Sequence, residues 1–395
     1  MQGIVQFLFW ASVLLLAYTY VGYPAVVFLW ARLRPSPVAR RRWEPGVTLV
    51  VVAHNEALRI EARLANLVSL DYPRHRLQIL VASDGSTDGT EELARAWEGA
   101  GVEIVAFERR RGKPAVLNDL FQLARGEIVV QADARQRFAA DVVRALVASF
   151  ADPMVGAVSG ELILTYDKGE SAVGEGVGAY WRFEKLIRWS ESQVDSAVGT
   201  TGAIYAIRRS LFEPIPEDTI LDDVWLPMRI VRRGYRVLFE PGARAWDQAP
   251  ATAAEELARK ARTLAGNFQL FAREGWLLNP FWNRLWFQTC SHKGLRLLTP
   301  LLQVVALTAN VLILDSAVYW LALVAQIAFY AAAVGGYAFR GASRSIPLLT
   351  VPYVVCLFGW ATVVGFVRFV TGRQRVIWDK ARPAGPQGEI LRPLA

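Results

Sequence analysis

Four long stretches of the chain consist almost entirely of apolar residues and contain no charged side chain. They comprise residues 3–31, 297–314, 317–339 and 346–367. A helix needs ~20 apolar residues to cross the hydrocarbon core of a bilayer, so each stretch is long enough, the second only just. A buried helix of a soluble protein is the alternative, and it is strongest for the shortest stretch. The pattern predicts membrane helices at the N-terminus and within residues 297–372.

A cluster of basic side chains follows the first apolar stretch. It consists of Arg32, Arg34, Arg40, Arg41 and Arg42. The positive-inside rule then places the N-terminus outside the cell and the middle of the chain in the cytoplasm. A cleaved signal peptide is disfavoured, because the stretch lacks a basic n-region and is too long for an h-region. We therefore expect residues 1–42 to form a membrane anchor with a basic segment after it.

The basic tail at residues 373–395 conflicts with four complete crossings. It contains Arg373, Arg375, Lys380 and Arg382. If the N-terminus is outside and all four stretches cross, this tail also lies outside, which the positive-inside rule opposes. We therefore expect one stretch to be re-entrant or interfacial. Residues 297–314, with Pro300 near the start, are the shortest candidate.

Between the two apolar regions, short strand-like runs alternate with helix-like stretches. Continuous apolar and β-branched runs, typical of buried strands, occupy residues 48–53, 77–83, 102–107 and 127–132. Helix-like stretches occupy residues 56–69, 87–98 and 113–124. This alternation predicts an α/β domain at residues 43–250, with a mostly parallel sheet and helices on both faces. Ligands of such sheets bind beyond the carboxyl ends of the strands.

The net charge of +8 lies mainly beside the apolar stretches. Basic clusters occupy residues 32–42, 259–262, 292–296 and 368–382. Clusters in such positions contact anionic lipid headgroups. We expect no nucleic-acid partner, because the soluble region shows no basic face with interleaved stacking aromatics. Cys290 and Cys356 lie in or near apolar stretches and give neither a disulfide framework nor a zinc-site spacing.

Residues 251–296 form a third zone of amphipathic character. Residues 255–269 are typical of a helix, with Arg259 and Arg262 on one face. Residues 276–296 are rich in Trp, Phe and Leu with basic side chains between them, as in a helix that lies in the membrane interface. An ordinary amphipathic packing helix fits this second pattern equally well.

Polar motifs follow directly after two of the predicted strands. His54-Asn55-Glu56 follows the first strand, and Asp84 opens the sequence DGSTDGT after the second. Both motifs have structural interpretations, because Asn55 can cap a helix and Asp-Gly can form a turn. A carboxylate at a strand tip can instead accept hydrogen bonds from a base or a ribose. We favour that function for Asp84.

Two further loops could contact a diphosphate. The sequence RRRGKPAVLN at residues 109–118 places Lys113 and Pro114 at a predicted helix start, where backbone N–H groups and the helix dipole favour phosphate. A solvated basic turn is the alternative. Asp133 follows the fourth strand, where a carboxylate can hold a divalent cation that bridges a pyrophosphate.

Asp222 and Asp223 stand together before an apolar helix. One of them could act as a general base that takes a proton from an acceptor hydroxyl. Adjacent carboxylates at a helix start are also favoured by the helix dipole, and their spacing alone favours this structural interpretation.

Taken in order, these motifs resemble those of the family 2 glycosyltransferases. The matching segments are HNE, DGSTDGT, GKPAVLN, QADAR, GTTGAIYAIRR and LDDVWLPMRI, within about residues 46–270. The apolar flanks are similar to those of the membrane-embedded branch, which includes synthases of hyaluronan, chitin oligomers, cellulose and poly-N-acetylglucosamine. The resemblance implies an inverting enzyme with a GT-A-like nucleotide-sugar-binding domain. It also implies a divalent cation, Mg or Mn, and a UDP-sugar as the usual donor.

The resemblance implies roles on the donor side for four residues. Glu56 and Asp84 would bind the nucleoside, and Lys113 would lie close to the nucleotide. Asp133 matches the first Asp of the family's Asp-x-Asp element, which contacts the diphosphate and its metal.

On the acceptor side, Asp223 matches the family's catalytic base, with Asp222 as its neighbour. Thr201 and Gly202 match a loop that lines the acceptor pocket. These two carboxylates and this loop are therefore the expected centre of the reaction.

The chain departs from the family pattern at two places. Arg135 stands where many members have a second, metal-binding Asp, so the metal site is expected to be weaker or completed by the diphosphate and water. Processive synthases carry a Gln-x-x-Arg-Trp motif, whose counterpart here is residues 259–263 (RKART). Arg262 is retained and could clamp a phosphate, but the Gln and the Trp are replaced. Long-chain processivity is therefore in question.

We expect a multi-pass cell-membrane glycosyltransferase whose catalytic domain faces the cytoplasm. Its acceptor would be a glycan or a lipid-linked glycan in exopolysaccharide or cell-surface glycan synthesis, among membrane lipids and other synthase subunits. A single-transfer enzyme that acts on a lipid or a polyprenyl phosphate is the alternative, and the altered residues 259–263 support it. A non-catalytic nucleotide-sugar-binding subunit is a further rival. A transporter is disfavoured, because residues 43–270 look soluble.

Overall fold

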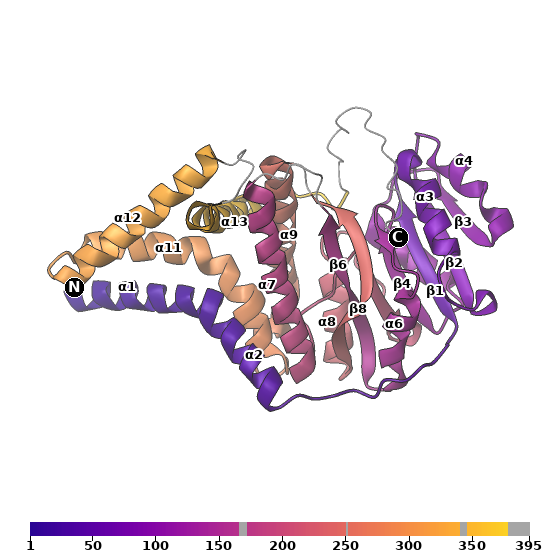
Figure 1. Ribbon diagram of the computed structural model, residues 1–395, viewed down its shortest axis with the longest axis horizontal. Helices are drawn as coiled ribbons and strands as arrows, with labels where there is room; N and C mark the ends of the chain where they lie inside the picture. The colour runs from indigo at the N-terminus through magenta and orange to yellow at the C-terminus, as the bar shows by residue number, and fades with distance from the viewer. Residues whose placement is uncertain (166–171, 250–251, 340–345, 378–395) are drawn as a thin grey trace.

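The computed structural model describes residues 1–165, 172–249, 252–339 and 346–377. The α/β domain and the apolar helices occupy opposite sides of the molecule (Figure 1). Helices α7 (Ala172–Val194) and α9 (Ala253–Arg273) stand between them. Lys380 and Arg382 of the predicted basic tail lie outside the described residues.

One eight-stranded sheet forms the centre of the α/β domain, in the order β3-β2-β1-β4-β7-β6-β8-β5. Strands β3, β2, β1 and β4 are parallel, and β6 is parallel to β8, whereas β7 and β5 are antiparallel to their neighbours. The strands are β1 Val47–Ala53, β2 Leu77–Asp84, β3 Val102–Phe107, β4 Ile128–Asp133, β5 Arg137–Phe138, β6 Val155–Thr165, β7 Ile204–Arg208 and β8 Arg236–Gln248. The predicted α/β sheet is therefore confirmed, and its second half is mixed.

The four predicted strands correspond to β1–β4, and no end differs from the predicted run by more than one residue. Their apolar runs are continuous because both faces of the sheet are covered. Leu49 and Val51 of β1 belong to the core on one face, and Val50 belongs to the core on the other. Alternate side chains of a strand point to opposite faces, so β1 needs apolar residues at successive positions.

Helices pack on both faces of the sheet. On one face, Leu64 of α3 and Val143 of α6 join the core, and on the other face Leu117 of α5 and Leu226 of α8 do so. The bounds of these helices, with α4 beside α3, are α3 Ala57–Val68, α4 Thr90–Arg95, α5 Lys113–Leu123, α6 Val142–Ala148 and α8 Asp222–Arg232. The predicted helices at 56–69 and 113–124 are confirmed. The one predicted at 87–98 is shorter.

In the part of the chain that the structure describes, four helices are long and apolar enough to cross a membrane. They span Gln2–Leu33, Trp286–Val311, Ala317–Ala338 and Pro347–Val370. All four predicted apolar stretches fall largely within these helices. The second helix begins before the predicted stretch and includes part of the zone that we assigned to the membrane interface.

The first two of these helices each contain a bend, and the two bends lie against each other. A π-helical turn, Tyr18–Gly22, joins α1 (Gln2–Ala17) to α2 (Tyr23–Leu33). A second π-helical turn, Thr289–Gly294, precedes α11 (Leu295–Val311). The hydroxyl groups of Tyr18 and Ser291 lie 2.9 Å apart, so the two turns meet. Figure 1 shows α1 and α11 side by side. The segments joined to them, α2 and the second π-helical turn, lie toward α7.

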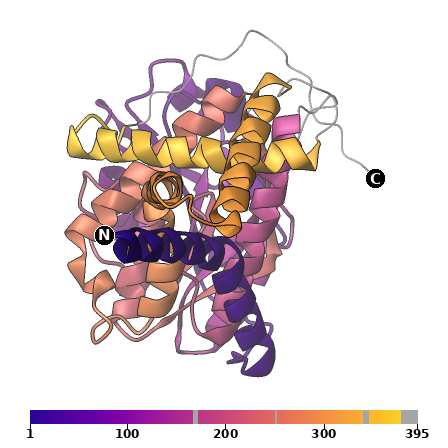
Figure 2. The same ribbon diagram turned by 90° about the vertical axis from the view of Figure 1, so that its left-hand side faces the viewer.

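Helix α13 (Pro347–Val370) runs across the direction of α11. Figure 1 shows α13 end-on and α11 along the picture plane, whereas Figure 2 shows α13 along its length, crossing α12 (Ala317–Ala338). After α13 the chain returns to the α/β domain. A Cβ atom at Gly112 would lie 3.7 Å from side-chain carbons of both Val376 and Ile377.

The prediction of a single helix over residues 276–296 is wrong. The chain there forms a 3₁₀ turn, a loop, the short helix α10 (Trp286–Gln288) and the second π-helical turn. Pro280 cannot donate a helical hydrogen bond. The Asn283 side chain donates to the Leu277 carbonyl at 2.9 Å and accepts from the Leu285 N–H at 3.0 Å. These local bonds take the place of a helical ladder.

The close packing of α13 on α9 depends on a glycine. A Cβ atom at Gly365 would lie 2.8 Å from the Ala261 carbonyl oxygen and 2.9 Å from the Ala265 nitrogen, so backbone would have to move. We expect Gly365→Ala to lower the free energy of unfolding by about 1–3 kcal/mol through overpacking. Thermal denaturation in detergent measures the effect. Gly335→Ala is the matched control, because its Cβ would meet only ordinary contacts at 3.5 Å. Equal melting temperatures for both variants would contradict the prediction.

Candidate active site

The loops after β1 and β2 are tied to each other at one edge of the sheet. Asn55 has a φ of 54° and accepts a hydrogen bond from the Thr87 N–H at 2.8 Å, while its own N–H donates to the Ser86 hydroxyl at 3.2 Å. His54 Nδ1 lies 2.7 Å from the Asp84 carbonyl oxygen. Asn55 is therefore not the cap of α3, which begins after Glu56.

Asp84 fixes the basic loop that precedes α5. Its carboxylate is buried, and the two oxygens accept hydrogen bonds from the N–H groups of Arg111 at 2.6 Å and Gly112 at 2.9 Å. The neighbouring Gly85 has a φ of +61°, and a Cβ atom there would lie 2.4 Å from the Arg110 nitrogen. The DGSTDGT motif thus holds the start of the loop that leads to Lys113.

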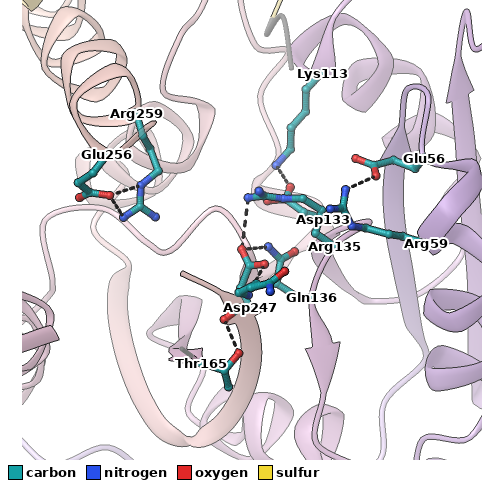
Figure 3. A network of polar contacts seen from close by, with 11 residues as sticks. Glu56, Arg59, Lys113, Asp133, Arg135, Gln136, Thr165, Asp247, Glu256 and Arg259 are labelled. Atoms are coloured by element: carbon teal, nitrogen blue, oxygen red, sulfur yellow. Dashed lines mark hydrogen bonds and ion pairs between the residues drawn. The ribbon is translucent and has the colours of Figure 1, made fainter. Parts of the chain in front are cut away.

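The ammonium group of Lys113 lies where several predicted site residues meet. Its Nζ is 2.9 Å from Asp133 Oδ1, 3.3 Å from the Gly202 carbonyl oxygen and 3.9 Å from Asp222 Oδ2 (Figure 3 shows the Asp133 contact). Burial lowers the pKa of Lys113, but the carboxylates of Asp133 and Asp222 more than offset it, so the pKa is raised. Lys113 is therefore a fixed positive charge.

Asp222 and Asp223 form the first turn of α8. Asp223 Oδ2 accepts a hydrogen bond from the Gly202 N–H at 3.0 Å, and its main-chain carbonyl accepts from the N–H and the hydroxyl of Thr200, both at 2.8 Å. Burial and the adjacent Asp222 raise the pKa of Asp223 to about 6, although Lys113 opposes the shift. Such a carboxyl group is ionised at neutral pH and is basic enough to accept a proton.

Two residues that the motifs did not single out lie close to this carboxylate. Arg188 of α7 donates to the Thr201 hydroxyl at 2.6 Å, and its charge acts to lower the pKa of Asp223. Tyr205 of β7 is buried, and burial together with Asp222 and Asp223 raises the pKa of its hydroxyl. Arg188 lies outside the matching segments, and Tyr205 lies inside GTTGAIYAIRR at a position to which the resemblance assigned no role, so only the folded chain shows that both face this carboxylate.

Arg135, at the position of the family's second Asp, pairs with a carboxylate far along the chain. Its Nη2 lies 3.2 Å from Asp247 Oδ2, and the Gln136 amide donates to the same oxygen at 2.9 Å (Figure 3). Asp247 also accepts from the Thr165 hydroxyl at its main-chain carbonyl, at 3.1 Å. This arrangement ties the loop after β4 to the ends of β6 and β8.

The region at the end of β4 offers few protein ligands to a cation. Within the described residues, no group of three or more His, Cys, Asp and Glu side chains could hold a metal ion. Asp133 is 36% exposed at its side chain and is already paired with Lys113. The residues present therefore fit a cation that Asp133 contacts through one carboxylate while phosphate and water oxygens supply the other ligands.

The remaining predicted residues lie around this centre at different distances. Arg262 of α9 interacts electrostatically with the carboxylates of Asp222 and Asp223; burial lowers its pKa, and these charges oppose the shift. Its Nη2 also donates to the Val376 carbonyl at 3.4 Å. Glu56 lies apart from the Lys113–Asp133 pair, beside Arg59 at 3.4 Å (Figure 3).

Comparison with known proteins relates one part of the chain to a family. Residues 48–213 match the model of glycosyl transferase family 2. A protein named probable glycosyltransferase YdaM, from Bacillus subtilis (strain 168), is 27% identical over 225 residues, covering 53% of this chain and 52% of the relative. A poly-beta-1,6-N-acetyl-D-glucosamine synthase from Staphylococcus aureus (strain COL) is 25% identical over 236 residues, covering 58% and 56%. The chain thus matches about half the length of these curated relatives.

A solved structure resembles the whole described architecture. It is the mannosyltransferase PcManGT from Pyrobaculum calidifontis, in complex with GDP-Man and Mn²⁺, which is 24% identical. The TM-score is 0.71, and the match covers 93% of this chain and 99% of that chain. The sheet, the flanking helices and the ordered motifs agree with a GT-A-like fold, and residues 48–213 match the glycosyl transferase family 2 model.

Proposed function

We propose that this chain is an inverting glycosyltransferase that moves a hexosyl or N-acetylhexosaminyl group from a nucleoside-diphosphate sugar to a glycan or lipid-linked acceptor. One observation carries the proposal. Asp223, with a pKa raised to about 6, lies beside Asp222, which is 3.9 Å from Lys113, and Lys113 is paired with Asp133. A proton acceptor and a site for a diphosphate thus lie next to each other.

The proposed reaction is a single displacement. The acceptor hydroxyl oxygen forms a bond to the anomeric carbon, the bond from that carbon to the diphosphate oxygen breaks, and the hydroxyl proton passes to Asp223. The transition state has oxocarbenium character by analogy with glycoside hydrolysis. Lys113 and Arg262 then stabilise the negative charge that develops on the departing diphosphate.

For the donor site, we assign the nucleoside to Glu56 and Asp84 and the diphosphate to Lys113 and Asp133. Both oxygens of Asp84 already accept one backbone hydrogen bond, so its contribution includes shaping the loop before α5 as well as any contact with the nucleoside. The similar mannosyltransferase was solved with GDP-Man, and the staphylococcal relative is named as an N-acetylglucosamine polymer synthase. We propose a UDP-sugar as the first donor to test.

A divalent cation, Mg²⁺ or Mn²⁺, is part of the proposal. It would neutralise charge on the diphosphate, and Asp133 is the residue that would contact it. The similar mannosyltransferase was solved with Mn²⁺. Because Arg135 pairs with Asp247 rather than offering a second carboxylate, most ligands of the cation must come from the donor and water.

We further propose that the chain is a multi-pass membrane protein whose catalytic domain is cytoplasmic. We assign three crossings, which are Gln2–Leu33, Trp286–Val311 and Ala317–Ala338. With an odd number of crossings, an N-terminus outside the cell leaves the C-terminal segment inside, as the positive-inside rule requires. Helix α13 would lie along the membrane surface, because it runs across α11 and packs on α9. Val376 packs against the core of the α/β domain, which supports a tail on the catalytic side and favours α13 over residues 297–314 as the interfacial segment.

A single-transfer enzyme is the second candidate. Thr263 stands where processive synthases have a Trp that stacks on the acceptor sugar, and its hydroxyl donates to the Arg259 carbonyl at 3.1 Å. Radiolabelled donor distinguishes the two, since a processive synthase gives a ladder of products and a single-transfer enzyme gives one added sugar. Purified protein that binds donor but releases no nucleoside diphosphate with any acceptor would instead indicate a non-catalytic subunit.

Replacing the proposed base should abolish most of the turnover. We expect Asp223→Asn to lower kcat by ~10²–10⁴, because an amide cannot accept the acceptor proton. Release of nucleoside diphosphate by the detergent-purified protein, with a screen of nucleotide-sugars and with Mg²⁺ or Mn²⁺, measures it. Asp218→Asn, an exposed carboxylate before α8, is the control and should keep wild-type turnover. Near-wild-type turnover by folded Asp223→Asn protein would remove Asp223 from the mechanism.

The pH profile should show the titration of Asp223. A general base must be ionised, so kcat/KM is expected to fall as the pH drops through about 6. Asp222→Asn removes a negative charge that raises the pKa of Asp223, and it should move this acid limb to lower pH. An acid limb that stays at the same pH in Asp222→Asn protein would argue against the assignment.

The loop before α5 should be sensitive to one glycine and not to a neighbouring one. Gly85→Ala places a Cβ atom 2.4 Å from the Arg110 nitrogen, and we expect the shifted loop to raise the donor KM about tenfold or more. Gly89→Ala is the matched control, because Gly89 also has a positive φ, of +88°, but a Cβ there would meet nothing nearer than 4.0 Å. Equal donor KM values for the two variants would contradict the role of the close contact.

A further inference from the structure

The loop before β7 is bonded directly to the proposed base. The N–H and the hydroxyl of Thr200 donate to the Asp223 carbonyl oxygen, both at 2.8 Å, and the Gly202 N–H donates to Asp223 Oδ2 at 3.0 Å. A Cβ atom at Gly202 would lie 2.8 Å from the same carboxylate oxygen, so loop and carboxylate are in contact. We refer to residues 199–202 as the base loop.

The direction of the Asp223 carboxylate depends on the base loop. Within the described residues, the hydrogen bond from the Gly202 N–H is the only one that reaches this carboxylate. The terminal torsion of an aspartate side chain is soft, so the group turns easily unless a partner fixes it. A shift of the Gly202 N–H would therefore turn the carboxylate away from an acceptor hydroxyl.

The base loop is held from behind by two side chains. Arg188 of α7 donates to the Thr201 hydroxyl at 2.6 Å, and the Thr201 N–H donates to the Ser159 hydroxyl at 2.9 Å. Ser159 is fully buried on β6, so it is fixed by the sheet. The bond from Arg188 has a charged donor, and such bonds are shorter and stronger than those between neutral groups. Arg188 thus ties the base loop to α7.

Helix α7 is itself fixed on both sides, so Arg188 has a defined position. Lys185 pairs with Glu161 of β6 at 2.6 Å. Glu184, one helical turn before Arg188, lies 3.1 Å from the ring of His292 in the second π-helical turn. The guanidinium group therefore approaches the base loop from a helix that is attached to the sheet and to an apolar helix.

The charge of Arg188 acts on Asp223 together with other groups. The titratable and charged groups that face Asp223 come from five elements: Asp222 of α8, Lys113 of α5, Arg188 of α7, Arg262 of α9 and the hydroxyl of Tyr205 on β7. Burial and Asp222 raise the pKa of Asp223, and the three cations lower it. In the proposed mechanism Lys113 and Arg262 face the donor diphosphate, which offsets their charge. Arg188 contacts the base loop instead, so its charge stays available to Asp223.

We propose that Arg188 is a positioning residue for the proposed base. It holds Thr201 so that the Gly202 N–H directs the Asp223 carboxylate toward the acceptor hydroxyl, and it keeps a positive charge beside that carboxylate while a diphosphate occupies Lys113 and Arg262. The inference rests on the proposed function. Arg188 acts through the base loop and through its charge, not by contact with the donor.

The first experiment compares pH profiles of nucleoside diphosphate release by the detergent-purified full chain. Arg188→Gln removes a charge that lowers the pKa of Asp223, so we expect the acid limb of kcat/KM to move up by about half a pH unit. At about pH 8, where Asp223 is ionised in both proteins, we expect kcat to fall about tenfold, because the carboxylate is no longer held in place. The donor KM should stay within about twofold of wild type, because Lys113 and Arg262 are unchanged.

Arg182→Gln is the matched control for this experiment. Arg182 is an exposed arginine of the same helix, and its variant should keep the wild-type profile. Arg188→Gln protein with the acid limb and the kcat of the control would overturn the proposal. A merely structural role of Arg188 would lower kcat and the melting temperature without moving the acid limb, and this outcome would also overturn it.

Two further variants separate the hydrogen bond from the charge. Arg188→Lys keeps the charge, and we expect its acid limb to return to the wild-type pH. Thr201→Val removes the acceptor of the Arg188 hydrogen bond and should lower kcat while Arg188 keeps its charge. An acid limb in Arg188→Lys that moves as far as in Arg188→Gln would overturn the role of the charge. Full kcat in Thr201→Val would overturn the role of the hydrogen bond.

A measurement without turnover distinguishes this inference from the proposed function. Dicyclohexylcarbodiimide modifies protonated carboxyl groups, and peptide mass spectrometry gives the pH at which half of Asp223 is modified. We expect this pH to be higher in Arg188→Gln than in wild type, and an unchanged value would overturn the inference. Turnover that depends on Asp223 but is the same in Arg188→Gln would overturn the inference alone. Wild-type turnover by Asp223→Asn would remove the proposed base, and the inference with it.

Discussion

The ion pair between Lys113 and Asp133 lies where the start of α5, the end of β4 and the start of α8 come together. Asp133, Asp222 and Asp223 are negative charges at one end of the sheet, and without a nearby cation their mutual repulsion would oppose folding. Burial and Asp222 raise the pKa of Asp223, and Lys113 offsets this only in part, which leaves that pKa at about 6. The same cation therefore holds the centre together and leaves one carboxylate basic, and a diphosphate arriving at this centre would meet a positive charge that is already fixed in place.

Much of the first half of the sheet could be predicted because its signal is local. The strands β1–β4 are short, continuous apolar runs, and each contributes side chains to the cores on both faces of the sheet. A run of buried positions is therefore enough to identify each strand. The second half could not be predicted in this way. The order β4-β7-β6-β8 joins strands that are far apart in sequence and mixes parallel with antiparallel pairs. The loop at 279–285 was missed for a similar reason, because Asn283 supplies side-chain bonds that hydrophobic periodicity does not reveal.

The site could be predicted where a polar residue follows a strand or precedes a helix. Lys113, Asp133, Asp222 and Asp223 all do so, and the fold brings them together. Other features depend on contacts that no local pattern encodes. Asp247 meets Arg135 from more than a hundred positions away, and Arg188 is one of two arginines on α7. A nucleoside contact of Asp84 is a prediction from the motif, whereas the backbone hydrogen bonds that both of its oxygens accept depend on the path of the loop before α5.

The connection between the apolar helices and the α/β domain is ionic as well as apolar. His292, fully buried, has one ring nitrogen 2.8 Å from Glu191 and the other 3.1 Å from Glu184, and Tyr23 of α2 donates to Glu191 at 2.5 Å. Burying such groups is costly, and removing one partner would leave an uncompensated charge. The network therefore opposes sliding or rotation of α2 and the second π-helical turn against α7. Since α7 also carries Arg188, which contacts the loop beside Asp223, the apolar helices are held in register with the proposed base. In the proposed enzyme, an acceptor that reached the site along those helices would then meet Asp223 in a fixed position.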